Sequence, residues 1–280
     1  MRIGLIGLGR IGAFHADTLA ALDDVDELVV TDPVGAAVDA VTGRIPKARA
    51  VDSPQALLDA GVDGVVVAAR DAVRDGSLGR VHTVRSTTLD PAPPPAAYLA
   101  VSGGIFRDCS VHDFDAVRWV TGQEVVSVYA VGVTDPDAPA EMYRDHGDHT
   151  SVSTLLTMSD GAIGVVSNTR TNARGYDVRL EVHGVSDAVA AGLDDGLPLR
   201  PTQPGVAWPA GPPHTFFMDR LAEAFRVELA TFCRVAAGEI PSPCTVDDAM
   251  GTAWAAEAAT LSAIEGRPVT IAEVQDRALV

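Results

Sequence analysis

The chain has 280 residues, of which 47% are hydrophobic and 21% charged, and its formal net charge is −17. This acidic balance argues against nucleic acid or an anionic membrane as a partner, since both attract positive surfaces. No apolar run is long enough to span a bilayer, and no signal-peptide cleavage site follows the apolar start, so we expect a cytoplasmic protein. Cys109, Cys233 and Cys244 are widely spaced and form no disulfide framework, which fits a reducing compartment.

A glycine-rich turn lies between an apolar run and a predicted helix near the start of the chain. Gly7, Gly9 and Gly12 have the spacing G-x-G-x-x-G. In dinucleotide-binding folds these glycines allow a tight turn, a close approach to the pyrophosphate and close packing of helix on strand. The pyrophosphate then binds free N–H groups at the helix N-terminus. We therefore predict that Gly7, Gly9, Arg10, Ile11 and Gly12 bind a cofactor.

An acidic residue follows the second predicted strand, 27–31. This residue, Asp32, stands 20 positions after Gly12, where an acid accepts a hydrogen bond from a ribose 2′-hydroxyl. Pro33 comes next and the following basic residue is Arg44, so no basic side chain is placed for a 2′-phosphate. The pattern favours NAD over NADP. The alternative interpretation is a glycine-rich turn that binds no ligand.

Strands and helices are predicted to alternate from the N-terminus to Ala69. Such alternation predicts a parallel sheet with helices on both faces and the strand order 3-2-1-4. The strands that would complete a doubly wound sheet are missing, so we predict an incomplete Rossmann domain over residues 1–69. The expected strands are 2–8, 27–31, 48–51 and 64–69, and the expected helices are 11–22, 34–42 and 54–60.

The pattern changes beyond residue 70 to longer strands in which apolar and polar residues alternate. Alternation with turns between strands is typical of an open antiparallel sheet with one covered face. We predict a substrate-binding and oligomerisation domain over 70–280, whose free sheet face another subunit covers. The expected strands are 81–89, 124–133, 150–158, 162–169 and 177–184, and the expected helices are 111–120, 215–237 and a last helix capped by Thr245.

The segment SGGIFRDCSVHDFD contains the candidate catalytic residues. Asp108 and His112 are four positions apart, which on an α-helix puts them on one face. A carboxylate beside an imidazole suits a general base that takes a proton from a hydroxyl. Asp113 and Asp115 add hydrogen-bond acceptors for a polyhydroxylated ligand. Alternatively, these acids only interact favourably with the dipole of the helix.

A metal site is the competing interpretation of this region. His146 and His149 are the histidines that would join the acids. The chain has neither an H-E-x-x-H motif nor a paired Cys/His spacing, so we predict no metal. A metal-dependent hydrolase or lyase is thus a distant alternative.

The chain also carries the segments GLIGLGRIGAFHA, VVTDP, GSLGRVHTVRS, GGIFRDCSVHDFD and NARGYDVRLEVHG. Together they resemble the Gfo/Idh/MocA oxidoreductases, and within them the inositol 2-dehydrogenases. The resemblance implies a homodimeric or homotetrameric enzyme that uses NAD to remove hydride from a secondary hydroxyl of a cyclitol or sugar, such as myo-inositol. It also implies that Asp108 and His112 are catalytic, with His112 as proton acceptor, and that Asp115 and Tyr176 contact the substrate.

The resemblance is interrupted between Ala69 and Arg70. At this point the family has two further βα units, on the order of fifty residues, including a strand ending in Glu-Lys-Pro whose lysine touches the reacting hydroxyl. The one lysine here, Lys47, precedes the third strand, at the wrong edge of the sheet. Arg70 follows a predicted strand end, where it is placed to orient a hydroxyl but not to shuttle a proton. A cofactor-binding but catalytically impaired homologue is therefore the alternative. A natural deletion, an engineered one and a longer parent chain all remain open.

Overall fold

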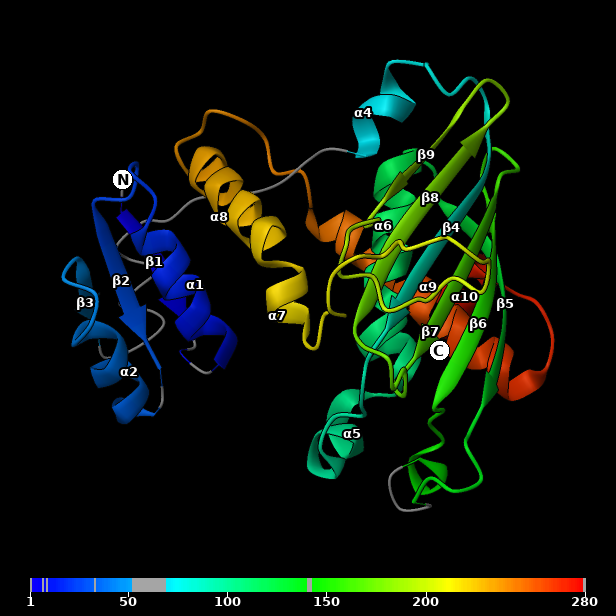
Figure 1. The fold of residues 1–280 in the computed structure, drawn as a ribbon, viewed down its shortest axis with the longest axis horizontal. Helices are drawn as coiled ribbons and strands as arrows, with labels where there is room; N and C mark the ends of the chain where they lie inside the picture. Colours follow the sequence, from blue (N-terminus) through cyan, green and yellow to red (C-terminus); the bar gives the residue numbers. More distant parts are fainter. Residues whose placement is uncertain are drawn as a thin grey trace. The chain divides into compact units, whose positions relative to one another are not determined.

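The computed structural model describes residues 2–6, 8, 10–32, 34–51, 69–139 and 143–278. The chain divides into two compact units (Figure 1). One unit contains residues 1–67 and 221–245, and the other contains residues 68–220 and 246–280. In the described ranges, no helix has both the length and the apolar character needed to cross a bilayer.

The first unit is built on a parallel sheet. Its described strands have the order β1-β2-β3, which confirms the 3-2-1 part of the predicted order. The predicted helix 54–60 and residues 64–68 of the predicted fourth strand lie outside the described residues, and Ala69 begins a helix instead. The elements are β1 (Arg2–Ile6), α1 (Arg10–Ala20), β2 (Glu27–Thr31), α2 (Gly35–Thr42), β3 (Ala48–Ala50) and α8 (Ala222–Ala236).

Helix α8 belongs to the first unit, whereas the prediction placed it in the second domain. The predicted helix 215–237 is interrupted at Leu221, whose φ of −106° and ψ of 12° are not helical. Beyond this break, the Phe225 ring packs edge-on against Phe14 of α1, with 5.7 Å between centroids. Leu229 and Cys233 are buried in the same apolar core. An amphipathic helix has to bury its apolar face, and the sequence pattern does not say against which sheet.

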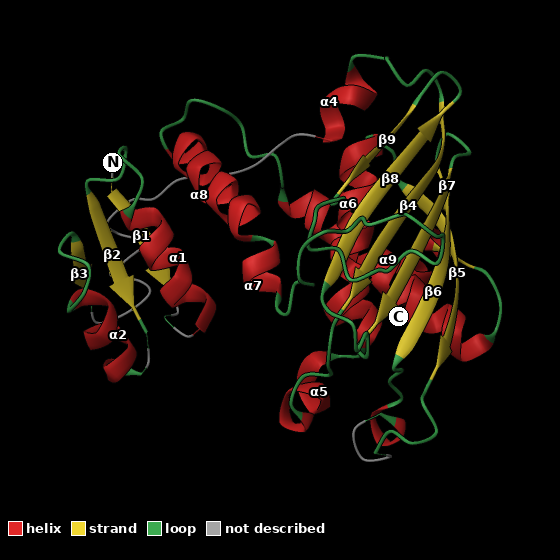
Figure 2. Cartoon of the chain, viewed as in Figure 1, coloured by secondary structure: helices red, strands yellow, loops and turns green. Residues whose placement is uncertain are grey.

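The second unit contains a sheet of order β10-β5-β6-β7-β4-β8-β9 (Figure 2). Its strand pairs are antiparallel except β4 with β7, which run parallel, so the predicted mostly antiparallel sheet is confirmed. The strands are β4 (Val81–Leu89), β5 (Val125–Val133), β6 (Ser151–Met158), β7 (Ile163–Thr169), β8 (Asp177–Gly184), β9 (Ala188–Ala191) and β10 (Val269–Thr270). The helices are α4 (Ala69–Arg74), α5 (Ala96–Ser102), α6 (Val111–Thr121), α7 (Phe217–Arg220), α9 (Val246–Glu265) and α10 (Ile271–Ala278), with the short turns η1 (Phe106–Ser110) and η3 (Arg144–His146).

Helices α6 and α9 cover one face of this sheet (Figure 2). In the layer between these helices and the sheet, the side chains of Val84, Phe114 and Leu156 are almost completely buried. Because side chains alternate between the two faces of a strand, the other face of β5 and β6 points outward. There Tyr129 lies opposite Leu155, and these side chains are 37% and 50% exposed.

A π-helical turn, η1, precedes α6, where the sequence predicts an ordinary helical spacing. Gly103 ends α5 with a φ of 80°, and Gly104 follows with a φ of 90°, a conformation that favours glycine. Asp108 lies within the π turn and His112 lies in α6. A π turn holds more residues than an α turn, so it rotates residues four apart away from the stacked positions predicted for them.

Candidate active site

Asp108 is held by two side chains from other elements of the second unit. The hydroxyl of Tyr98, on α5, donates a hydrogen bond of 2.5 Å to its Oδ1. Arg170, which follows β7, donates from Nη1 to Oδ2 at 2.8 Å. The first of these bonds raises the pKa of the Tyr98 phenol. Both carboxylate oxygens of Asp108 are therefore fixed.

Arg170 links the π turn to the loop before β6. Its side chain is 1% exposed, and its Nη2 lies 3.4 Å from Oδ2 of Asp148, which is also buried. Oδ1 of Asp148 accepts the backbone N–H groups of Ile105 and His149 at 2.7 and 2.8 Å. One buried guanidinium thus lies between two carboxylates and fixes the position of Asp108.

Asp113 belongs to the core and not to a ligand site, contrary to the prediction. Its side chain accepts hydrogen bonds from Ser86, from Thr88 at 3.1 Å and from the Asn168 amide at 2.6 Å. Its residue exposure is 2%, and burial raises the pKa of its carboxyl. The contacts tie α6 to β4 and β7, which positions the helix that carries His112.

Asp90 is a further candidate site residue, which the sequence motifs did not indicate. It follows β4 where Arg170 follows β7, and its N–H donates to the carbonyl of Thr169 at 2.8 Å. Burial raises the pKa of Asp90 to about 6; the charge of Arg170 opposes this shift and that of Asp108 adds to it. The available signal was an acid at the carboxyl end of a strand, in TTLDP.

The other predicted site residues of the second unit are His112, Tyr176 and Asp115. His112 is exposed on α6, and no hydrogen bond or ion pair joins it to Asp108 in the described part of the chain. Tyr176 is 7% exposed, its ring lies 6.4 Å from that of Phe217, and burial raises the pKa of its phenol. Asp115 accepts a hydrogen bond of 2.9 Å from Thr252 of α9. No contact between described residues brings Asp115 to Asp90 or Asp108.

The predicted cofactor residues lie in the first unit. Gly7 and Gly9 are outside the described residues, whereas Arg10, Ile11 and Gly12 form the start of α1. Asp32 follows β2, and its oxygens accept the N–H groups of Leu8 at 2.5 Å and Val34 at 2.7 Å, which lowers its pKa.

These features fit the adenosine and pyrophosphate half of NAD. The first turn of α1 contains no acidic residue that would compete with a phosphate. Each carboxylate oxygen of Asp32 keeps a further lone pair for a ribose hydroxyl.

Lys47 and Arg70, the two basic residues compared above with the lysine of the family, both make contacts within the fold. Lys47 donates to the carbonyls of Leu22 at 3.2 Å and Val25 at 2.5 Å, so it stabilises the connection from α1 to β2. Arg70 lies in α4 and its guanidinium stacks 5.1 Å from the ring centroid of Trp119. Ala69, predicted as the last residue of a strand, instead begins α4, so Arg70 lies in the first turn of a helix, and the preceding residues of the predicted strand lie outside the described residues.

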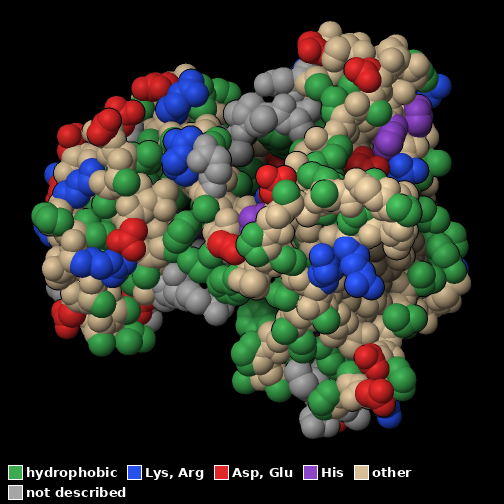
Figure 3. Space-filling model, viewed as in Figure 1, with side chains coloured by type: hydrophobic (Ala, Val, Ile, Leu, Met, Phe, Trp, Pro, Cys, Tyr) green, Lys and Arg blue, Asp and Glu red, His purple; other side chains and the backbone are tan. Residues whose placement is uncertain are grey.

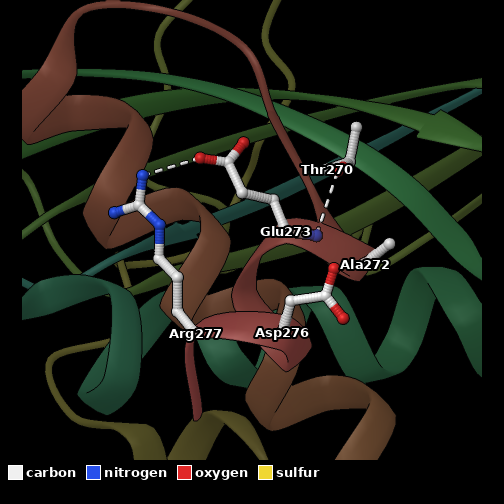
Figure 4. A pocket seen from close by; sticks show the side chains of 5 residues that line it. All are labelled: Thr270, Ala272, Glu273, Asp276 and Arg277. Atoms are coloured by element: carbon white, nitrogen blue, oxygen red, sulfur yellow. Dashed lines mark hydrogen bonds and ion pairs between the residues drawn. The ribbon is translucent and has the colours of Figure 1, made fainter. Parts of the chain in front are cut away.

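A surface pocket at α10 is unrelated to these residues (Figure 4). It is lined by Thr270, Ala272, Glu273, Asp276 and Arg277. Arg277 donates to Glu273 at 2.7 Å, and the N–H of Glu273 donates to Thr270 at 3.2 Å. Three of its residues, Thr270, Glu273 and Arg277, thus bind one another, and none of the predicted site residues lines the pocket. On the face drawn in Figure 3, basic and acidic side chains are both exposed, in small separate groups.

Comparison with known proteins decides the family. The family model of the GFO/IDH/MocA C-terminal domain matches residues 66–189. An inositol 2-dehydrogenase of Rhizobium meliloti (strain 1021) is 30% identical, over 97% of this chain and 99% of the relative. The chain belongs to the GFO/IDH/MocA family. A crystal structure of a myo-inositol dehydrogenase from Corynebacterium glutamicum superposes on this GFO/IDH/MocA protein with a TM-score of 0.81 at 27% identity, over 96% of this chain and 98% of the other.

The same comparison also gives the size of the segment that this chain lacks relative to its relatives. The alignment with the Rhizobium meliloti protein spans 335 positions and takes in 97% of the 280 residues here, about 272. About 63 positions therefore have no counterpart in this member of the GFO/IDH/MocA family. This difference is of the size predicted for the segment absent between Ala69 and Arg70.

Proposed function

We propose that this GFO/IDH/MocA protein is an NAD-dependent dehydrogenase that oxidises a secondary hydroxyl of a cyclitol or sugar, such as myo-inositol. Its relatives include the inositol 2-dehydrogenase of Rhizobium meliloti and a Bacillus subtilis protein named scyllo-inositol 2-dehydrogenase (NAD(+)), which is 26% identical over 97% of the chain. The observation that carries the proposal is the group of Asp90, Asp108 and Arg170 beside α6, the helix of His112.

The proposed reaction assigns cofactor binding to the first unit and proton transfer to the second. Oxidation of an alcohol removes a hydride from carbon and a proton from oxygen, and the alcohol is too weak an acid to ionise first. The exposed imidazole of His112 takes this proton, and Asp108 is a fixed negative charge nearby. Asp115 and Tyr176 contact the substrate hydroxyls. NAD, when bound, accepts the hydride.

In the first unit, Gly7, Gly9 and Gly12 let the backbone approach the pyrophosphate, and Arg10 and Ile11 present N–H groups of the first helical turn. Asp32 accepts a hydrogen bond from the ribose 2′-hydroxyl. The carboxylate is already oriented for this contact because two backbone N–H groups hold it.

The test compares His112→Ala with Asp32→Ala. His112→Ala should lower turnover of myo-inositol by about a hundredfold or more and leave the affinity for NAD unchanged, because it removes only the base. Asp32→Ala should weaken NAD binding and have a smaller effect on turnover at saturating NAD. The rates are measured as NADH absorbance and the affinity by isothermal titration. The exposed His146 provides the matched control, His146→Ala, which should change neither quantity.

Unchanged turnover in His112→Ala would contradict the assignment of the base. The runner-up proposal is a homologue that binds NAD but is catalytically impaired, since it lacks the family lysine. That protein would bind NAD in the titration and form no NADH with any polyol.

The proposal also includes a homodimer or homotetramer in the cytoplasm that associates through the outer face of the large sheet. This face carries Tyr129, Leu155 and Ile163, of which the last two are each 50% exposed. Neighbouring exposed apolar side chains of this kind are typical of an association surface.

A further inference from the structure

Tyr98 binds Asp108 and is at the same time open to solvent. It lies on α5, its hydroxyl donates a hydrogen bond of 2.5 Å to Oδ1 of Asp108, and 48% of the residue is exposed. We propose that Tyr98 is a further substrate-binding residue, whose phenol oxygen accepts a hydrogen bond from a hydroxyl of the cyclitol or sugar. The inference rests on the proposed function, because it places the substrate beside Asp108.

Two side chains of the described part of the chain bind the carboxylate of Asp108, and they differ in their access to a ligand. Arg170 donates to Oδ2 at 2.8 Å, but its side chain is 1% exposed and also faces Asp148. A ligand cannot reach this guanidinium without opening the core. Tyr98 comes from α5 on the exposed side, so a ligand that approaches Asp108 from solvent meets the tyrosine and not the arginine.

The hydrogen bond to Asp108 determines how the phenol can bind a ligand. An ionised carboxylate only accepts hydrogen bonds, so the single proton of the phenol is used on Asp108. This bond raises the pKa of Tyr98, as do burial and the charge of Asp108, and the phenol therefore stays protonated. Its oxygen can then only accept a further hydrogen bond, and donation to a charged group makes it a stronger acceptor. The ligand has to supply a donor, as a hydroxyl group does.

The charges beside Tyr98 favour a neutral ligand. Arg170 lies between Asp108 and Asp148, so its positive charge is already balanced by two carboxylates. An ionised acid would have no carboxyl proton to donate to the phenol oxygen, and Asp108 would repel it. A hydroxyl group donates without adding charge. The site therefore favours neutral cyclitols and sugars over sugar acids.

Helix α5 is anchored by groups other than the Tyr98 hydroxyl. The carbonyl of Pro95 accepts the N–H groups of Tyr98 and Leu99 at 2.9 and 3.1 Å, and Leu99 is 2% exposed. At the other end, Arg107 donates to the carbonyl of Gly103 at 2.8 Å. Tyr98 therefore has a defined position beside Asp108, and removal of its hydroxyl alone should leave the helix in place.

The test measures the binding of myo-inositol to the full chain saturated with NADH, by isothermal titration. With the reduced cofactor no hydride can be transferred, so the affinity is measured without turnover. Tyr98→Phe removes the hydroxyl and keeps the ring. It should raise the dissociation constant of myo-inositol about threefold to tenfold, the usual effect of one hydrogen bond, and leave that of NADH unchanged. The matched control is Val101→Ala, at an 80% exposed position on the same helix, which should change neither constant.

Monodeoxy analogues of myo-inositol show whether the phenol oxygen contacts a hydroxyl. For one analogue, the native protein should lose about threefold to tenfold in affinity, whereas Tyr98→Phe should bind this analogue and myo-inositol about equally. Losses that add for every analogue, or an unchanged affinity in Tyr98→Phe, overturn the inference and leave the proposed function standing. If the native protein binds myo-inositol but oxidises no polyol, the proposed function fails, and the analogues still decide the role of Tyr98. A native protein that binds no cyclitol or sugar overturns both.

Discussion

Replacing Arg170 with methionine tests whether the buried guanidinium holds the site together. The change removes the cation between Asp108 and Asp148, whose side chains are 14% and 3% exposed, and keeps most of the volume of Arg170. Removing one partner of a buried ion pair costs about 3–5 kcal/mol. Since Asp108 is partly exposed to water, we expect a loss of about 3 kcal/mol in the free energy of unfolding, at the lower end of this range. For a unit of this size that lowers the Tm by about 6–12 °C.

Calorimetry of the native protein and the variant at pH 7 measures this loss. Arg107→Met is the matched control, because Arg107 and Glu257 form a pair whose side chains are 41% and 39% exposed, and an exposed pair contributes about 0–1 kcal/mol. Lower pH should reduce the deficit of Arg170→Met, since protonation relieves the two carboxylates left without a cation. A loss no larger than that of Arg107→Met, or a deficit that does not change with pH, would refute the reasoning.

Two other predictions concern Asp90 and the outer sheet face. In the folded protein the pKa of Asp90 is about 6, above the ordinary 3.8, so its contribution to stability is present below pH 4 and is lost as pH rises through 6. Asp90→Asn should therefore raise the free energy of unfolding by about 1–3 kcal/mol at pH 8 and change it little below pH 4. Thermal melts at the two pH values measure this difference. A variant that is less stable than the native protein at pH 8 would contradict the prediction. Leu155→Glu should convert the expected oligomer to monomer in sedimentation at micromolar concentration, whereas Ile264→Glu, at a 77% exposed position on α9, should not. Equal sedimentation of the two variants would contradict the proposed surface.

The sequence by itself determined much of the secondary structure. Strands β2 and β4 have the predicted bounds, 27–31 and 81–89, because β2 is a short apolar run rich in β-branched residues and β4 alternates regularly between buried and exposed positions. The order of β1, β2 and β3 followed from short βαβ connections. The motif around Asp108 and His112 was also visible, since both residues lie in one segment.

The sequence did not predict other local features, because tertiary contacts determine them. Helix α5 forms directly after a proline run, DPAPPP, and two glycines with positive φ follow it. The π turn is stabilised from outside the segment, by Asp148 and Arg170. Helix α8 packs on the first unit because its apolar face fits that core.

Only the tertiary structure determined the partners of the candidate site. Asp90 and Arg170 are far apart in the sequence, and the parallel pairing of β4 with β7 brings them to the same end of the sheet. Asp113 looked like a ligand acceptor until its hydrogen bonds to β4 and β7 showed it to be part of the core. Sequence periodicity reports which face of an element is buried, but sheet register decides which side chains meet there, and with them the charge and the pKa of each group.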